Sequence, residues 1–471
     1  MLAEALESLR RFQARRSPRE RLLWNRVRLN VWPDIELAPE EAGPLIDRYA
    51  RETEGLGIET VIIKGRMRDP RDGQVRDREL RLFAPAGRGV IVELDDPATR
   101  PLQPLDEGAR RVVQARRRGS VHPAELVKVL APERRDPARS IPRGEFVEHD
   151  LDADGQLVPV DRAPAMNEAG IVVGTTCSYT DRFPDGMKRV VLLGDPTKAL
   201  GSVAEPECRR IIAALDMAEE LGVPVEWFAL SSGARIAMDS GTENMDWVAA
   251  ALRRIIEFTQ QGGEINVVVT GINVGAQPYW NAEATMLMHT RGILIMTPES
   301  AMVLTGKQAL DFAGGVSAED NFGIGGYDRI MGPNGQAQYW APDLAGACSV
   351  LLRYYEHAYV APGERFPRRA ETRDPVERDV RSAPHTLAGS ELATVGEIFS
   401  DETNPGRKQA FDIRSVMRAV VDSDHRPLER WERMRDAEAA VVWDAHLGGW
   451  PTTVIGIESH PIDRFGPVPA V

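Results

Sequence analysis

Cysteine is scarce in this chain. Three cysteines occur in 471 residues, Cys177, Cys208 and Cys348, and no C-x-x-C pair or Cys/His ligand spacing is present. This argues against a zinc site, so we expect no metal in this region. An odd and sparse cysteine count also fits a reducing compartment, and we expect the protein to be cytoplasmic.

Long apolar runs and an excess of basic residues are also missing. No stretch approaches the roughly 18 apolar residues of a membrane-spanning helix. The first residues, MLAEALESLRRFQARR, indicate a charged amphipathic helix rather than a secretory signal. The formal net charge is -13, which disfavours nucleic acids and anionic membranes. We therefore expect no nucleic acid and no membrane among the partners.

Two glycine-containing segments lack the spacing of nucleotide-binding motifs. In Thr305-Gly306-Lys307, Gln308 stands where a phosphate-binding loop needs Ser or Thr. Lys307 is then either a point charge near a ligand or a solvated lysine. The segment 322–335 is dense in glycine but is not followed by a dinucleotide-type helix, so we interpret it as a loop.

An acidic segment resembles a calcium-binding loop in part. Asp150, Asp152, Asp154 and Gly155 match D-x-D-x-D-G, and Asp161 falls at the twelfth position, which normally carries Glu. Both flanks indicate extended chain rather than the required helices. We therefore predict a hairpin turn, with calcium binding as the alternative.

The chain length suggests about two or three domains. We predict an α+β region over residues 1–130, a linker rich in proline and charge over 131–143, an α/β domain over 144–400, and the start of another α/β unit over 401–471. Periodicity predicts helices over 2–14, 39–53, 112–117, 123–130, 205–221, 245–258, 276–289, 344–357 and 411–421. It predicts strands over 25–37, 60–67, 79–83, 89–94, 171–176, 189–193, 223–230, 265–269, 292–296, 301–305, 439–442 and 453–457.

Two of these strands end in turns built from small residues. The strand 265–269 leads through Gly271–Ala276 into a helix, and the strand 223–230 leads into Ser231–Arg235. The first amides of a helix have no internal acceptor and carry the positive end of its dipole. Two such turns can direct two backbone N–H groups at one oxygen, as enolate chemistry on a thioester requires. Each turn taken alone also fits a purely structural junction.

A set of short motifs follows in order between residues 157 and 449. They are LVPVDR (157–162), NEAG (167–170), FPDG (183–186), LGD and GS (193–202), SGARI (232–236), G, GA and Y (271–279), LTG and AL (304–310), GG and NG (325–335), and FDIR with LGG (411–449). In this order they resemble the carboxyltransferase component of biotin-dependent acyl-CoA carboxylases, above all multidomain acetyl-CoA carboxylases. Residues 24–130 resemble, more distantly, the non-catalytic central region of those enzymes.

The resemblance implies a fold and a reaction. The fold would be an α/β, crotonase/ClpP-like ββα superhelix, preceded by the smaller α+β region and followed by an incomplete second crotonase-like lobe. The lobe at 144–400 would bind the acyl-CoA, here a coenzyme A thioester. Carboxybiotin on a separate domain or chain would supply CO2 to its α carbon, giving a malonyl-CoA-type product for fatty acid synthesis.

The resemblance also assigns roles to residues at the two turns. The backbone amides of Gly275 and Ala276 would stabilise the thioester enolate. Those of Gly233 and Ala234, at the other turn, would complete or border the same hole.

Four further residues are candidates for substrate binding: Arg235, Ser232, Tyr279 and Lys307. Arg235 would either meet a CoA phosphate or brace its loop. Tyr279 and its neighbour Trp280 would either form a wall of the acyl pocket or pack in the core.

Several parts of a complete carboxylase are absent from the sequence. It contains no A-M-K-M biotin attachment sequence and no ATP-grasp signature, and it ends at Val471, before the glycine turn of the family's second lobe. The expected partners are therefore biotin carboxylase and biotin carrier domains or subunits, the missing C-lobe, and a second copy in a homodimer or larger assembly. Two alternatives stay open: another crotonase-fold enzyme, such as a decarboxylase or a hydratase using Glu283, and a non-catalytic assembly module.

Overall fold

A computed structural model describes residues 2–16, 21–22, 25–32, 56–68, 72–83, 91–97, 106–117, 119–137, 140–238, 240–286, 290–314, 318–375 and 377–466. The chain divides into two compact units. The first comprises Met1–Val129 with Ala163–Met166, and the second comprises Leu130–Arg162 with Asn167–Val471. The predicted helix 39–53 and the end of the predicted strand 25–37 lie outside the described residues.

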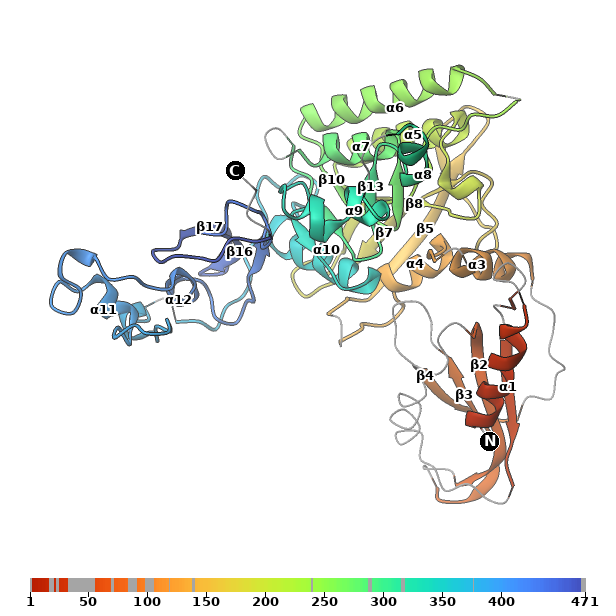
Figure 1. The fold of residues 1–471 in the computed structure, drawn as a ribbon, viewed down its shortest axis with the longest axis horizontal. Coiled ribbons are helices and arrows are strands. Elements are labelled where there is room, and N and C mark those ends of the chain that lie inside the picture. Colours follow the sequence, from red (N-terminus) through yellow and green to blue (C-terminus); the bar gives the residue numbers. More distant parts are fainter. Residues whose placement is uncertain are drawn as a thin grey trace. The chain divides into compact units, whose positions relative to one another are not determined.

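The first unit is built on a four-stranded sheet (Figure 1). Its strands pair in the order β1-β2-β3-β4, with β1 parallel to β2 and the other pairs antiparallel. Apolar residues of α1 pack on the sheet around Met67 and Leu80, which are buried. The elements are α1 (Leu2–Ala14), β1 (Asn25–Asn30), β2 (Ile58–Arg68), β3 (Val75–Phe83), β4 (Ile91–Asp95), α3 (Glu107–Arg117) and α4 (Pro123–Leu130).

The second unit contains an eight-stranded sheet in the order β14-β12-β10-β9-β8-β7-β5-β6. The pairs from β14 to β8 are parallel, and the pairs from β8 to β6 are antiparallel. Its strands are β5 (Gly144–Leu151), β6 (Leu157–Pro159), β7 (Ile171–Ser178), β8 (Met187–Gly194), β9 (Val225–Ala229), β10 (Ile265–Val269), β12 (Leu294–Met296) and β14 (Tyr339–Trp340). A small parallel pair, β11 (Ile272–Val274) and β13 (Ala301–Val303), stands apart from it.

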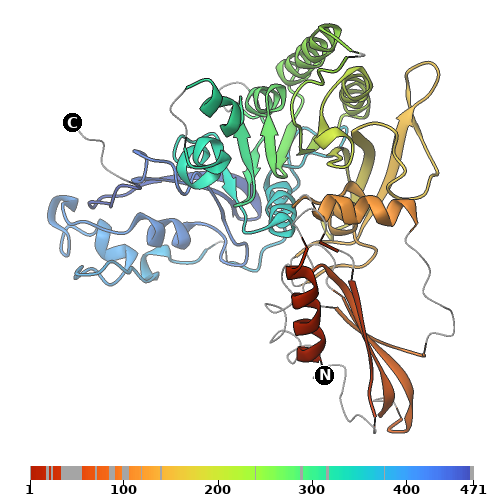
Figure 2. The same ribbon diagram turned by 45° about the vertical axis from the view of Figure 1, so that its right-hand side comes forward.

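Helices cover both faces of the large sheet (Figures 1 and 2). The helices of this region are α5 (Glu205–Leu221), α6 (Glu243–Gln260), α7 (Ala276–Ala284), α8 (Lys307–Phe312), α9 (Asn321–Gly325) and α10 (Leu344–Ala358), with the short helical turns η2 (Ala199–Gly201) and η3 (Tyr327–Met331). Because side chains alternate along a strand, Ile265 and Val267 face the α5–α7 side while Asn266, between them, donates to the Tyr355 hydroxyl on α10. Helix α10 therefore lies on the opposite face of the sheet from α5, α6 and α7.

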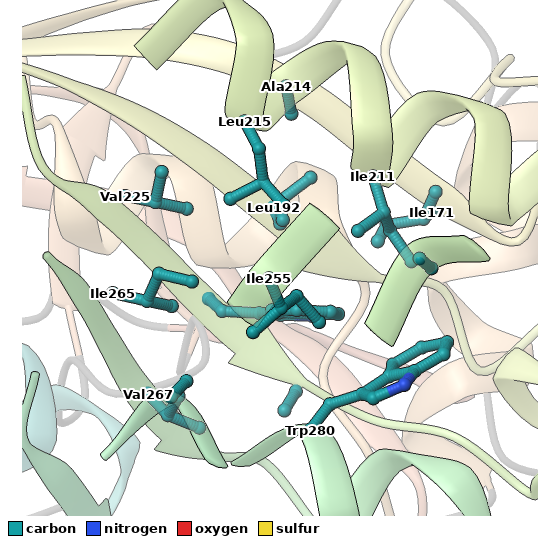
Figure 3. Close-up of a cluster of buried hydrophobic side chains, with 14 of the residues drawn as sticks. Ile171, Leu192, Ile211, Ala214, Leu215, Val225, Ile255, Ile265, Val267 and Trp280 are labelled. Carbon is teal, nitrogen blue, oxygen red and sulfur yellow. The ribbon is translucent and has the colours of Figure 1, made fainter. Parts of the chain in front are cut away.

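The main core lies between the sheet and α5, α6 and α7 (Figure 3). Ile211 and Leu215 of α5, Ile255 of α6 and Trp280 of α7 meet strand residues such as Leu192, and all five are at most 1% exposed. Burying one large apolar side chain contributes about 1.5–3 kcal/mol. This core therefore fixes the sheet whose strand ends carry the two turns of small residues.

Two segments test the predicted loops. The acidic segment forms the hairpin between β5 and β6, as predicted, and the Asp150 carboxylate is engaged by Arg162 and Arg210. The prediction of a loop over 322–335 was wrong for residues 322–331, which are helical except at Gly326. Asp320 caps α9 by accepting from the Gly323 amide, and the π-helical turn η3 follows.

The C-terminal part of the second unit contains a three-stranded antiparallel sheet, ordered β15-β16-β17. Gly448 and Gly449, both with positive φ, form the tight turn between β16 and β17, and α12 packs on β17 through Met417 and Val454. The elements are η4 (Val380–Ser382), α11 (Val395–Phe399), η5 (Pro405–Arg407), α12 (Ile413–Val420), β15 (Leu428–Arg430), β16 (Ala440–Leu447) and β17 (Trp450–Ile457).

Candidate functional site

The two turns of small residues lie side by side at one edge of the sheet. They follow β9 and β10, which are parallel neighbours in register from Val225↔Ile265 to Ala229↔Val269. The Val274 amide donates to the Ser231 carbonyl oxygen at 2.8 Å, which joins the turns directly. We call residues 231–235 and 271–276 together the paired turns. Ligands bind commonly at this carboxyl edge of parallel strands.

Glycine allows the paired turns to approach each other. Gly233 and Gly275 have φ values of 97° and 67°, which side-chain-bearing residues rarely adopt. A Cβ atom built on Gly275 would lie 3.3 Å from the Gly233 Cα. A side chain at position 275 would therefore strain its own backbone and push the two turns apart.

The four backbone amides predicted to act here differ in their hydrogen bonds. The Gly275 N–H donates to the Val303 carbonyl oxygen at 3.1 Å, and the Gly233 N–H donates to the Ser231 hydroxyl oxygen at 3.1 Å. Neither group is free to bind a substrate oxygen.

The amides of Ala234 and Ala276 have no hydrogen-bond acceptor within the described parts of the chain. Ala276 is the first residue of α7, so its N–H belongs to the unpaired amides at the positive end of that helix. The paired turns thus offer one unused donor each.

A buried amide network, which the sequence reasoning missed, holds the second turn. Asn273 donates to the Ala229 carbonyl oxygen at 2.9 Å, and Asn281 donates to the Asn273 side-chain oxygen at 3.0 Å. Gln277 donates to the Asn281 side-chain oxygen at 2.9 Å, and all three side chains are buried. The network links Gln277 and Asn281 of α7, through Asn273, to Ala229 at the end of β9. Breaking any of these bonds would leave a buried amide unpaired, which is costly. The available signal was a set of Asn and Gln side chains on a short helix after a buried strand.

The first turn presents Ser232 and Arg235 differently. The Ser232 hydroxyl donates to the Ala199 carbonyl oxygen at 3.1 Å. The Arg235 backbone is bonded to Val203 and Asn244, while its side chain is exposed. In the part of the chain that the structure describes, the Arg235 guanidinium forms no ion pair, so it is available to an anionic group.

The remaining substrate candidates divide between surface and core. Tyr279 is 59% exposed, whereas Trp280 is 1% exposed and packs against Trp227 with ring centroids 5.7 Å apart. The core alternative is therefore confirmed for Trp280. Lys307 begins α8 and pairs with Asp311 on the next turn of that helix.

Two further side chains with possible reactivity lie on α5 and α7. Burial raises the pKa of the Cys208 thiol to about 12, which keeps it protonated and unreactive. Glu283, the candidate for hydratase chemistry, lies half-buried on α7. Among the residues that the structure describes, no cluster of three or more His, Cys, Asp or Glu side chains is arranged to hold a metal ion, and no helix is long and apolar enough to span a membrane.

Comparison with known proteins defines the family. The carboxyl transferase domain family matches residues 146–462, which is more than half of the chain. The chain therefore belongs to the carboxyl transferase domain family. The resemblance identified from the ordered motifs is confirmed.

Curated relatives include two yeast carboxylases. "Acetyl-CoA carboxylase, mitochondrial" of Saccharomyces cerevisiae (strain ATCC 204508 / S288c) is 23% identical over 377 residues, covering 67% of this chain and 16% of that protein. "Acetyl-CoA carboxylase" of the same strain is 23% identical over 386 residues, covering 68% of this chain and 16% of that protein. The chain thus spans about a sixth of the length of these relatives.

Among solved structures, the fold resembles that of the transcarboxylase 12S hexamer, determined with hydrolysed methylmalonyl-coenzyme A bound. The TM-score is 0.55 at 18% sequence identity, over 74% of this chain and 59% of that chain. A second structure of the same protein, with methylmalonyl-coenzyme A and methylmalonic acid bound, gives the same values. The likeness confirms a mixed α/β fold of this type.

Proposed function

We propose that this chain binds an acyl-CoA and stabilises the enolate of its thioester, so that the α carbon can accept a carboxyl group from carboxybiotin. The main support for this proposal is that the backbone amides of Ala234 and Ala276 have no acceptor within the described chain. Their two turns are held together by the hydrogen bond from the Val274 amide to the Ser231 carbonyl oxygen. A thioester oxygen that becomes an oxyanion gains most from donors that are fixed before the reaction. In this proposal Gly233 and Gly275 shape the paired turns, and Ala234 and Ala276 donate.

Side chains near the paired turns could bind the CoA and acyl portions of the substrate. Arg235 offers an exposed cation for a CoA phosphate, on the same turn as the exposed Ser232. Tyr279 presents its ring on α7, and Lys307 follows β13, the strand whose Val303 anchors Gly275. These four residues are proposed to bind the CoA and acyl portions.

Exposed apolar side chains on neighbouring segments support a partner surface. Ile236 is 86% and Leu304 60% exposed. Ile236 directly follows the first of the paired turns, and Leu304 directly follows Val303, which accepts from the Gly275 amide. At the other end of the unit, the edge strand β17 exposes Ile455 and Ile457. Apolar groups of this size on an edge strand are usually covered. We propose that a second copy or a second lobe covers these surfaces, and that biotin carboxylase and biotin carrier partners complete the enzyme.

The substrate is proposed as acetyl-CoA, with methylmalonyl-CoA as the alternative. Acetyl-CoA carboxylase is the name of the yeast relatives, whereas the transcarboxylase 12S structures contain methylmalonyl-coenzyme A. A cytoplasmic location and a role in fatty acid synthesis remain predictions.

Calorimetric titration of the chain with acetyl-CoA and with methylmalonyl-CoA tests the proposal. We expect saturable binding that Gly275→Val abolishes, because the added side chain separates the paired turns. Gly306→Ala is the matched control, since its Cβ would meet its nearest neighbour at an ordinary 3.7 Å. Equal binding by the wild type and Gly275→Val would contradict the placement of the thioester, and the tighter of the two ligands would identify the preferred acyl group.

A further inference from the structure

A separate cavity lies between the β14 edge of the large sheet and the C-terminal part of the second unit. It has a volume of about 700 Å³ and is bounded by β14, α10, α12, β15 and the loop 421–427. None of its lining residues belongs to the paired turns. The residues that matter here are Trp340, Arg353, Arg414, Arg418, Arg426 and Trp443, and we call this hollow the arginine cavity.

The carboxylates of the wall are mostly engaged elsewhere. Glu429 pairs through both oxygens with Arg414 and also accepts from the Trp443 indole N–H. Asp422 accepts the backbone amides of Gly448 and Gly449 at 2.8 and 2.6 Å. The charge of Arg414 is therefore neutralised by Glu429, and the Asp422 carboxylate is used to hold the β16–β17 turn. Glu432 is the remaining carboxylate in the described lining of the cavity.

Three arginines of the cavity lack such partners. Arg353 donates to the Pro427 carbonyl oxygen at 2.9 Å and to the Arg426 carbonyl oxygen at 3.4 Å. The side chains of Arg418 and Arg426 are exposed. Across the described chain, no carboxylate lies within ion-pair distance of any of the three. Three guanidinium groups thus face one lining carboxylate, Glu432.

Two of these cations, Arg353 and Arg426, repel each other. Burial, together with the nearby charge of Arg426, lowers the pKa of Arg353, although the Glu356 carboxylate acts in the other direction. The folded protein therefore holds like charges close together in a partly dehydrated space. An anion entering the cavity would relieve this repulsion and gain charge-assisted hydrogen bonds.

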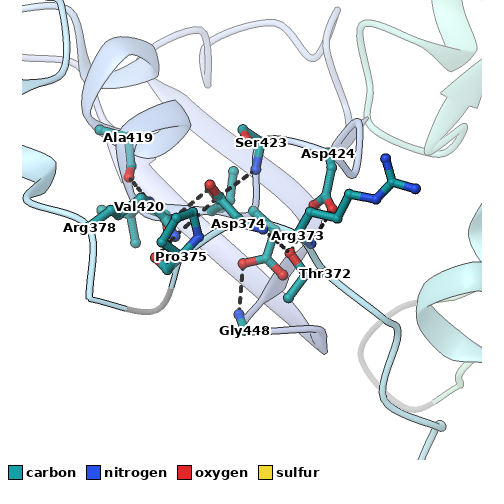
Figure 4. A network of polar contacts seen from close by, with 12 residues as sticks. Thr372, Arg373, Asp374, Pro375, Arg378, Ala419, Val420, Ser423, Asp424 and Gly448 are labelled. Carbon is teal, nitrogen blue, oxygen red and sulfur yellow. Dashed lines mark hydrogen bonds and ion pairs between the residues drawn. The ribbon is translucent and has the colours of Figure 1, made fainter.

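The frame around the cavity is fixed by a polar network (Figure 4). Arg378 donates to the Val420 and Val421 carbonyl oxygens at the end of α12, and it pairs with Asp374 at 3.1 Å. Asp374 in turn accepts the Ser423 amide at 2.8 Å. The backbone of the loop that leads to Arg426 is thereby anchored at Ser423.

We propose that the arginine cavity binds a phosphate ester of nucleotide size. Its phosphates would contact Arg353, Arg418 and Arg426, and its planar base would lie against Trp340, which is 44% exposed. Guanidinium groups match phosphate oxygens in geometry and charge. The volume falls within the roughly 300–1,000 Å³ of small-molecule sites. This site does not depend on the proposed carboxyl transfer.

Calorimetric titration with ADP tests this site, with adenosine and pyrophosphate as the comparison ligands. We expect ADP to bind, adenosine not to bind, and pyrophosphate to bind more weakly than ADP. Arg418→Gln and Arg426→Gln should each weaken ADP binding about tenfold. Arg253→Gln is the control, because Arg253 is an exposed arginine of α6 paired with Glu257, and it should leave ADP binding unchanged.

The proposal would be overturned by no ADP binding, by adenosine binding as tightly as ADP, or by unchanged ADP binding in both cavity variants. Gly275→Val separates this site from the thioester site. ADP binding that survives Gly275→Val supports a second site, and ADP binding lost with it would place the nucleotide at the paired turns instead. The thermal unfolding midpoints of Arg418→Gln and Arg426→Gln, measured beside the wild type, show whether each variant is folded.

Discussion

A column of three histidines should make the stability of this protein depend on pH. The rings of His357, His446 and His425 stack in sequence, with successive centroids 4.5 Å apart, and His357 and His446 are buried. Neither ring nitrogen of His357 has a hydrogen-bond partner in the described chain. Burial lowers the pKa of His357 to about 4, although the Asp444 carboxylate acts in the other direction. Burial and the neighbouring His357 lower the pKa of His446 to about 3.

The direction of the effect follows from proton binding. The unfolded chain protonates each histidine near pH 6.5, whereas the folded protein keeps these two neutral down to about pH 4 and 3. The stability that they contribute is therefore present above pH 6.5 and is lost as the pH falls below it. For His357 alone, the loss between about pH 7.5 and about pH 5.5 is about 1.3 kcal/mol.

His357→Phe isolates this contribution, because it keeps an aromatic ring in the column and removes the titrating group. Urea unfolding of the wild type and the variant, at both pH values, gives the two changes in unfolding free energy. We expect the wild type to lose about 1.3 kcal/mol more than the variant over this interval. The comparison is needed because burial raises the pKa of Glu264 to about 7, which favours folding at the lower pH in both proteins. Equal pH dependence of the two proteins would refute the reasoning.

Two further predictions concern the core of the second unit. Trp280→Ala should lower the unfolding free energy by about 3–5 kcal/mol in urea, because it leaves a cavity beside Trp227; a loss below 1 kcal/mol would show that the site collapses freely. Glu226→Gln should lower the unfolding free energy by about 3–5 kcal/mol, because it removes the charge that pairs with fully buried Arg189 at 2.7 Å. The exposed pair of Arg253 provides the control, since Glu257→Gln should cost about 0.5 kcal/mol or less.

Much of the secondary structure could be predicted because local signals agree with packing. The helix Glu205–Leu221 was predicted to the residue, with Pro206 in its first turn and Gly222 in the left-handed conformation at its end. The strand prediction 223–230 exceeded the observed Val225–Ala229 by a few residues. Strand ends depend on neighbouring strands, which the apolar run alone does not specify.

The segment 321–331 could not be predicted from its composition. Its glycines indicated a loop, but the Asp320 cap and the burial of Tyr327 favour helical turns there. Tertiary packing supplied the stabilisation that intrinsic propensity did not.

The candidate site was only partly predictable. The paired turns follow from two buried strands ending in small residues, and parallel pairing places them side by side. Which amides stay unused depends on the pairing of β11 with β13, since Val303 occupies the Gly275 N–H. The arginine cavity carried no local signal, because Arg353, Arg418 and Arg426 converge only in the folded chain.

The central claim is that the Ala276 N–H donates to the thioester oxygen, and infrared spectroscopy of bound acetyl-CoA with a labelled carbonyl tests it most directly. Ala276→Pro removes this N–H at the first helical position, where proline fits, and Ala276→Ser retains it. We predict that the carbonyl band of bound acetyl-CoA shifts to lower wavenumber in the wild type and Ala276→Ser, and that the shift is smaller in Ala276→Pro. The same shift in all three proteins, or bound acetyl-CoA with an unshifted band in the wild type, would contradict the claim.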